Sequence, residues 1–178
     1  MRLSTSLCAL ALLAAPVALA SDDATLTSDA RAVVETFKKK DANIEKFFRS
    51  ATGWVVFPTI AKGGFVVAGA GGDGVLFVGG HPVGRSSMGQ ASVGLQLGGQ
   101  TYSEIIFFEN AATLSEFKKG NFALAAQASA VALSAGAAAA ANYENGVAIF
   151  TATKTGLMYE ASVGGQKFGY QPFGAPKK

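Results

Sequence analysis

The spacing of apolar residues differs between the beginning of the chain and the remainder. Between residues 22 and 50 the apolar positions recur at three- and four-residue intervals, which is typical of amphipathic helices. These positions are Val33, Val34, Phe37, Ile44, Phe47 and Phe48. Asp41 lies between the two groups and is predicted to cap a second short helix that ends before Gly53. The pattern therefore predicts two short amphipathic helices.

From Gly53 onward the chain shows short apolar, β-branched and aromatic runs separated by glycines, which is typical of strands. The predicted strands are residues 54–57, 65–68, 75–78, 92–97, 102–108, 147–150, 157–159 and a last run near 168–170. One helix interrupts them, with Asn110 as its N-cap, Leu114 and Phe117 on one face and Gly120 after its end. Turn signals at intervals of roughly 8 to 12 residues favour an antiparallel sheet or barrel.

The segment from Asn121 to Tyr143 contains no charged residue and is rich in alanine. The propensity of alanine favours a buried helix, whereas the alternating larger residues Phe122 and Leu124 favour a strand. A membrane span is disfavoured because the apolar content is mostly alanine and polar residues interrupt it. Spacing alone leaves helix and strand equally open.

The first twenty residues have the three parts of a secretory signal peptide. Arg2 gives the basic start, residues 7–15 the apolar centre and residues 18–20 an Ala-x-Ala cleavage site. The apolar centre is too short to span a membrane, which needs about 20 residues. We therefore expect residues 1–20 to be a signal peptide and residues 21–178 to be a single domain that is periplasmic or secreted. Cleavage removes Cys8, the only cysteine, and with it disulfide and thiolate chemistry.

Composition narrows the classes of function. The 178 residues are 49% hydrophobic and 15% charged, and they include 22 glycines, all of them after residue 52. Soluble domains are usually about 25% charged, and this composition disfavours both disorder and coiled coil. The formal net charge of +3 is too weak to indicate nucleic acid as a partner.

Motifs for catalysis or for cofactor binding are weak. Residues 69–74 form a Gly-x-Gly-x-x-Gly pattern after a predicted strand, but another predicted strand follows where dinucleotide binding needs a helix. We therefore predict no cofactor and interpret Gly72-Asp73 as a hairpin turn.

His81 is the only histidine, which excludes a multi-histidine metal site, and we place it in a loop. Glu104 and Glu109 lie on opposite faces of a predicted strand. We predict no catalytic residue and no metal ligand.

Basic residues in the first two predicted helices are interleaved with aromatic ones. The basic residues are Lys38, Lys39, Lys40, Lys46 and Arg49, and their apolar neighbours are Phe37, Ile44, Phe47 and Phe48. Such a segment can dock on an anionic lipid surface, where each Lys or Arg contributes on the order of 1 kcal/mol and aromatic rings insert shallowly. Alternatively, the aromatic stripe packs on the sheet and the lysines form an ordinary solvated face. Composition alone favours this second interpretation.

Several short motifs together resemble the SYLF domain family. Residues 51–65 contain an Ala-x-Gly, an apolar strand and a Lys-x-Gly-Phe, and residues 69–75 are a glycine-rich stretch that ends in Gly-Val. Further matching segments are residues 94–100, 105–108 with the helix that follows, 156–157 and 162–165. In this order the motifs cover nearly the whole chain after residue 20, and no single motif carries the resemblance.

The resemblance implies a phospholipid-binding module. Eukaryotic SYLF proteins bind phosphoinositides and some bind and bundle actin, whereas secreted bacterial relatives resemble stand-alone lipid-binding domains. It also implies that residues 38–49 contact the membrane, that Lys62 is the lysine of the family's Lys-x-Gly-Phe, and that residues 122–133 form a strand. Actin binding is not carried over to a chain with an export signal.

We therefore predict an α+β fold in which N-terminal amphipathic helices pack on a Gly-rich, mainly antiparallel β-sheet or partly closed barrel. The predicted function is non-catalytic binding of a phosphoinositide-type anionic phospholipid by an exported, peripherally membrane-associated protein, with Phe47 or Phe48 entering the acyl boundary. The predicted lipid-binding residues are Lys38, Lys39, Lys40, Lys46, Phe47, Phe48, Arg49 and Lys62. A self-associating structural protein of the cell envelope and a hydrolase that uses His81 are the alternatives, and the sequence leaves the oligomeric state open.

Overall fold

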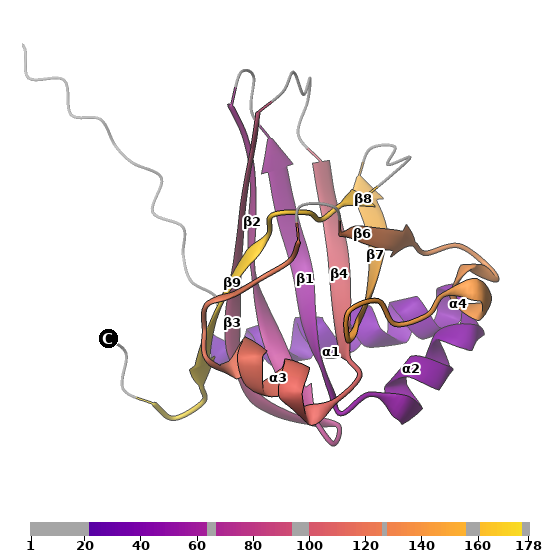
Figure 1. The fold of residues 1–178 in the computed structure, drawn as a ribbon, viewed down its shortest axis with the longest axis horizontal. Helices are drawn as coiled ribbons and strands as arrows, with labels where there is room; N and C mark the ends of the chain where they lie inside the picture. The colour runs from indigo at the N-terminus through magenta and orange to yellow at the C-terminus, as the bar shows by residue number, and fades with distance from the viewer. Residues whose placement is uncertain (1–21, 64–66, 94–99, 126–127, 156–160, 176–178) are drawn as a thin grey trace, which may run out of the picture.

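The computed structural model describes residues 22–63, 67–93, 100–125, 128–155 and 161–175 (Figure 1). The helical elements are α1 (Asp23–Lys40), the 3-10 turn η1 (Ala42–Ile44), α2 (Glu45–Ser50), α3 (Ala111–Lys118) and α4 (Ala137–Ala140). The strands are β1 (Gly53–Gly63), β2 (Val67–Val78), β3 (His81–Val93), β4 (Gln100–Phe108), β5 (Phe122–Ala123), β6 (Ser129–Ala132), β7 (Val147–Thr155), β8 (Ala161–Ser162) and β9 (Lys167–Pro172).

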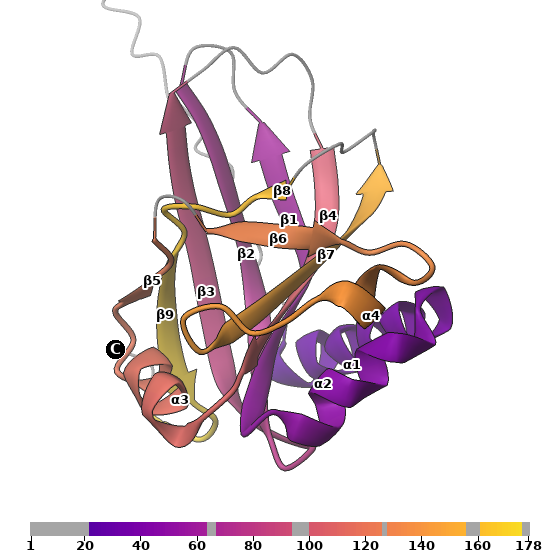
Figure 2. The ribbon, with the colours of Figure 1, turned by 45° about the vertical axis from the view of Figure 1, so that its right-hand side comes forward.

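The strands form a curled sheet in the order β5-β9-β3-β2-β1-β4-β7-β6-β8. Every neighbouring pair is antiparallel except β6 and β7, which are parallel. Helices α1 and α2 lie on one side of the central strands, and α3, β9 and β6 lie on the other (Figures 1 and 2). The predicted α+β class with a curled sheet is confirmed, and the predicted packing of N-terminal helices on the sheet is confirmed in part, for α1. No helix within the described ranges combines the length and the apolar character needed to cross a membrane.

Helix α1 buries one face against the sheet. Its buried residues Leu26, Ala30, Val33 and Phe37 follow the helical repeat, so one continuous stripe contacts the strands. The predicted cap at Asp41 is confirmed, because its Oδ1 accepts a hydrogen bond from the amide of Asn43 at 3.0 Å. The element that it opens is the 3-10 turn, and α2 follows directly.

Strand β2 corrects the prediction of a hairpin turn at Gly72-Asp73. Both residues lie inside one long strand, where they pair with Met88 and Ser87 of β3. A Cβ atom on Gly72 would lie 2.5 Å from the carbonyl oxygen of Thr59 in β1, so the glycine permits a close approach of two backbones. The register between β1 and β2 also shifts at this point, and Pro58 is accommodated within β1 instead of ending it.

The hairpin between β2 and β3 turns at Gly79 and Gly80, whose φ values are +58° and +79°. His81 is therefore the first residue of β3, and its predicted place in a loop is wrong. Most of strand β3 was not predicted, because its buried positions do not show an alternation of large apolar residues. These positions are Gly84, Ser86 and Met88, of which two are small or polar. Most of the predicted strand at 92–97, part of the one at 65–68, and all of the one at 157–159 lie outside the described residues.

The alanine-rich segment combines the two conformations left open by its sequence. It contains the short strands β5 and β6 and the single-turn helix α4. The strand implied for residues 122–133 is thus confirmed in part, with residues 126–127 outside the described residues.

Apolar side chains fill the space on both faces of the central strands. In β4, Ile105 and Phe107 pack with the residues of α1 and α2, whereas Ile106 and Phe108 pack with Leu114 and Phe117 of α3. Burial on both faces explains why the central strands are continuous apolar runs and do not alternate with polar residues.

Candidate membrane-binding face

The end of α1 and all of α2 carry the predicted basic residues. Lys39, Lys40 and Arg49 are exposed and have no ion-pair partner among the residues that the structure describes. Lys38 is half-buried, because its Nζ lies 3.0 Å from Glu45 Oε1 and 4.9 Å from the centre of the Phe48 ring. The structure therefore brings these four cations onto one pair of helices.

Lys46 has a different role from its basic neighbours. Its Nζ donates hydrogen bonds of 2.9 Å to the carbonyl oxygens of Ala139 and Ala141, at the end of α4. At the other end of α4, the Oδ2 atom of Asp41 accepts a hydrogen bond of 2.7 Å from the amide of Ala138. A carboxylate at the start of a helical turn and an ammonium at its end match the polarity of the peptide groups. We call this pair of contacts the α4 clasp.

Asp41 is 4% exposed, and the hydrogen bond from Ala138 lowers the pKa of its carboxyl below the ordinary value. A carboxyl with a lowered pKa contributes stability above its unfolded-state pKa and loses it as the pH falls through the folded-state value. We expect Asp41→Ala to lower the thermal unfolding temperature at neutral pH, with the deficit shrinking in strong acid. The exposed Asp29→Ala is the matched control. An equal deficit at both pH values would contradict a contribution from the charge.

Phe47 and Phe48, predicted to insert into lipid, lie in different environments. Phe47 is 2% exposed and packs with the rings of Phe107, Phe150 and Tyr143, at centroid distances of 5.5, 4.9 and 5.3 Å. The prediction that Phe47 enters the acyl boundary is inconsistent with this burial, because the ring belongs to the core between α2 and the sheet. Phe48 is partly exposed, so it alone of the two reaches the surface.

An open cleft of about 490 Å³ lies between α1 and the sheet beside Phe48. The side chains along it are Arg31, Val34 and Lys38 of α1, Phe48 of α2, Trp54 of β1 and Phe77 of β2. Trp54 and Phe77 are stacked, with centroids 6.1 Å apart and planes 13° apart, and Phe48 meets Trp54 edge-on at 5.2 Å. We call this the aromatic cleft.

Two cations and one carboxylate surround the aromatic cleft. Arg31 lies with its Cζ 5.5 Å from the centre of the Phe77 ring, and Lys38 lies over Phe48. Glu35 also lines the cleft, between them on the same face of α1. The sequence did not single out Arg31, Trp54 or Phe77 as site residues. For Arg31 a signal was present, because residues 31, 34, 35 and 38 are spaced so that they lie on one helix face.

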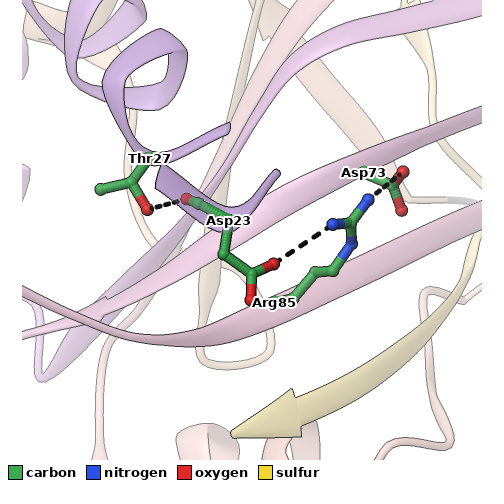
Figure 3. A network of polar contacts seen from close by, with 4 residues as sticks. All are labelled: Asp23, Thr27, Asp73 and Arg85. Atoms are coloured by element: carbon green, nitrogen blue, oxygen red, sulfur yellow. Dashed lines mark hydrogen bonds and ion pairs between the residues drawn. The ribbon is translucent and has the colours of Figure 1, made fainter. Parts of the chain in front are cut away.

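The position of α1 on the sheet is fixed near its start by Arg85 of β3 (Figure 3). The Arg85 guanidinium donates to Asp73 Oδ2 at 2.8 Å and to Asp23 Oδ1 at 3.2 Å. The hydrogen bond to Asp73 is the main reason that the pKa of Arg85 is raised. Because Asp23 is the first residue of α1, this network attaches the helix to two strands and so sets where Arg31 and Lys38 lie.

Residues 89–170 match the family model described as Ysc84, Las17-binding protein actin regulator. This match agrees with the resemblance of the chain to the SYLF domain family. The match includes β4, α3, β7 and most of β9, whereas α1, α2 and β1 precede it. No curated protein matches the chain.

Lys62, which was also predicted to bind lipid, lies apart from the basic helices. It is partly exposed near the end of β1, where it pairs with Gln100 of β4. Gly53, which follows α2, begins the same strand, so the length of β1 separates Lys62 from α2 by about 30 Å. The structure brings Lys38, Lys39, Lys40 and Arg49 together and leaves Lys62 at the far end of the sheet (Figure 1).

The segment that matches the family model holds a buried carboxyl group, Glu104 of β4. Its side chain is 0% exposed, and its Oε2 accepts a hydrogen bond of 3.2 Å from Nε2 of Gln166. Tyr102 and Thr151 are the buried polar neighbours, and Oε1 of Glu104 and Oε1 of Gln166 have no partner among the described side chains. Burial raises the pKa of Glu104 to about 8. This carboxyl is therefore mostly protonated at neutral pH.

His81 and the acidic residues do not form a recognisable catalytic or metal-binding cluster. His81 is exposed at the start of β3, on the rim of the β2–β3 hairpin. Within the described ranges, no three His, Cys, Asp or Glu side chains are close enough together to hold a metal ion.

Proposed function

We propose that this SYLF-domain protein binds anionic phospholipid, of the phosphoinositide type, at a membrane surface without catalysing a reaction. The observation that carries the proposal is the group of exposed cations Lys39, Lys40 and Arg49 on α1 and α2, which have no ion-pair partner in the described part of the chain. The SYLF family is associated with lipid and actin binding and is generally non-enzymatic. Both the family association and the charge of the face support a lipid surface as the partner.

The location of the protein is part of the same proposal. Residues 1–20 have the composition of an export signal, so the lipid surface is one that a periplasmic or secreted protein meets. Export keeps the chain away from cytoplasmic actin. Peripheral attachment through helices α1 and α2 then requires no membrane-spanning segment.

The electrostatic contribution sets the size of the expected effect. Each Lys or Arg close to an anionic headgroup layer contributes on the order of 1 kcal/mol, and salt screens this attraction. Replacing Lys39, Lys40 and Arg49 together with glutamine is therefore expected to reduce binding to vesicles that contain phosphatidylglycerol by about two orders of magnitude. Lys46 is left unchanged, because it holds α4 and its loss would disturb the fold.

Co-sedimentation with vesicles at low and high salt measures this effect. The matched control is the triple glutamine variant of Lys118, Lys119 and Lys167, which removes the same charge from exposed positions at the end of α3, just after it and in β9. The control variant is expected to bind as the unaltered protein does. Equal binding by both variants, each shown to be folded, would falsify the assignment of this face. Concentration-dependent self-association with no lipid preference would favour the structural envelope protein.

A further inference from the structure

Three clefts lie along the described surface, and their chemistry differs. The cleft between the alanine-rich segment and β7, of about 510 Å³, has Glu144 as its charged residue. The cleft on the far flank of α1, of about 340 Å³, is lined by Asp29, Lys40 and Lys154, and the ammonium of Lys154 is already bonded to Thr59 Oγ1 at 2.9 Å. Of these three clefts, only the aromatic cleft is lined by three aromatic side chains together with two cations.

The floor of the aromatic cleft contains a buried donor that the protein leaves unused. Nε1 of Trp54 is inaccessible to solvent and has no hydrogen-bond acceptor among the described residues. A buried indole N–H usually finds a partner, because an unmade hydrogen bond costs about 1–3 kcal/mol. A small shift of the Trp54 ring is needed to expose this donor to an ester or phosphate oxygen of a bound molecule.

The charged side chains define the polar part of such a ligand. Arg31 has no carboxylate within ion-pair distance in the described part of the chain, and its guanidinium can form paired hydrogen bonds with a phosphodiester. Lys38 adds a second cation, although its Nζ also forms an ion pair with Oε1 of Glu45 at 3.0 Å. The partly exposed rings of Phe48 and Trp54 provide the apolar surface for the adjoining glycerol esters and the first acyl carbons, and the buried ring of Phe77 supports Trp54 from below.

We propose that the aromatic cleft binds one glycerophospholipid molecule, with its phosphodiester between Arg31 and Lys38 and its esterified glycerol on Phe48 and Trp54. This inference rests on the proposed membrane function and adds a defined subsite to it. The volume of about 490 Å³ lies within the range of small-molecule sites and suits a headgroup with its glycerol better than two whole acyl chains. The exposed lysines attract the surface, and the cleft holds a single lipid.

Trp54 makes the cleft directly observable, because it is the only tryptophan of the chain. Dihexanoyl phosphatidylglycerol, kept below its micelle-forming concentration, is expected to change the Trp54 fluorescence with a saturable dependence on concentration. Dihexanoylglycerol, which has no phosphate, and glycerol 3-phosphate, which has no acyl groups, are expected to bind about tenfold more weakly or less. An equal response to glycerol 3-phosphate would show a free-phosphate site and overturn the proposal.

Matched variants separate the cleft from general charge. Arg31→Gln with Lys38→Gln is expected to weaken binding of the short-chain lipid about tenfold or more. Lys118→Gln with Lys167→Gln removes the same charge at exposed positions of α3 and β9, away from the cleft, and is expected to leave binding of the short-chain lipid unchanged. Glu35→Gln, which removes the carboxylate of the rim, is expected to strengthen it a few-fold. Equal loss in both double variants would overturn the subsite.

The two proposals fail in distinguishable ways. Absence of a saturable Trp54 response while vesicles are still bound overturns the cleft and leaves the proposed function standing. Loss of both the Trp54 response and vesicle binding overturns both. A Trp54 signal that varies with protein concentration in the absence of lipid shows that a second copy of the chain covers the cleft, and it also overturns this inference.

Discussion

Replacing Phe47 with alanine is expected to lower the free energy of unfolding by about 3–5 kcal/mol, the usual cost of truncating a buried phenylalanine. The ring is 2% exposed and contacts Phe107, Phe150 and Tyr143, so its removal leaves a cavity between α2 and the sheet. Chemical denaturation of the folded protein measures the loss. For a domain of marginal stability, a loss of this size removes a large part of the total.

The adjacent Phe48 is the natural comparison. Its ring is partly exposed and lies at the aromatic cleft, so Phe48→Ala is expected to cost clearly less stability than Phe47→Ala. Both variants lose the same atoms from neighbouring positions of one helix. Similar destabilisation by the two would contradict the assignment of Phe47 to the core and Phe48 to the surface.

Replacing Glu104 with glutamine is expected to remove a pH dependence of stability. The folded-state pKa of Glu104 is about 8, and the ordinary value is 4.5. Between these values the folded protein keeps the proton while the unfolded chain releases it, so stability falls as the pH rises, by about 1.4 kcal/mol per pH unit. Above pH 8 the folded state also ionises, and the loss is then complete. Below pH 4.5 this contribution is fully present.

Denaturation of the native chain and Glu104→Gln across this pH range measures the effect. Glutamine has nearly the same shape as the neutral carboxyl and cannot ionise, so the variant is expected to become the more stable of the two as the pH rises. Glu109→Gln, at an exposed position just beyond β4, is the control for a general change in charge. A constant difference between the native chain and Glu104→Gln at every pH would contradict a buried, neutral carboxyl group.

The helices were predictable because local chemistry defines them. Asp41 and Asn110 each accept a hydrogen bond from the amide two or three residues later, and such caps are visible in sequence. The choice between Phe47 and Phe48 was not visible, because both are apolar neighbours on a broad helix face. Only the sheet decides which of them is covered.

The role of Gly72 in β2 and the composition of the aromatic cleft could not be predicted from the sequence. Gly72 was interpreted as a turn residue because glycine permits turns, but here it allows β1 and β2 to approach closely. The cleft combines Arg31, Trp54 and Phe77, which come from three elements far apart along the chain. Their proximity results from strand pairing and from the attachment of α1 by Arg85, neither of which has a local sequence signal.

The α4 clasp has a consequence for how the protein can meet a membrane. Because Asp41 and Lys46 hold α4 from both ends, the end of α1 and α2 cannot leave the sheet without releasing residues of the alanine-rich segment. The two regions are thus a single cooperative unit, although about 90 residues separate them along the chain. In the proposed membrane contact, a lipid surface would therefore meet helices that are already packed on the sheet and bonded to α4.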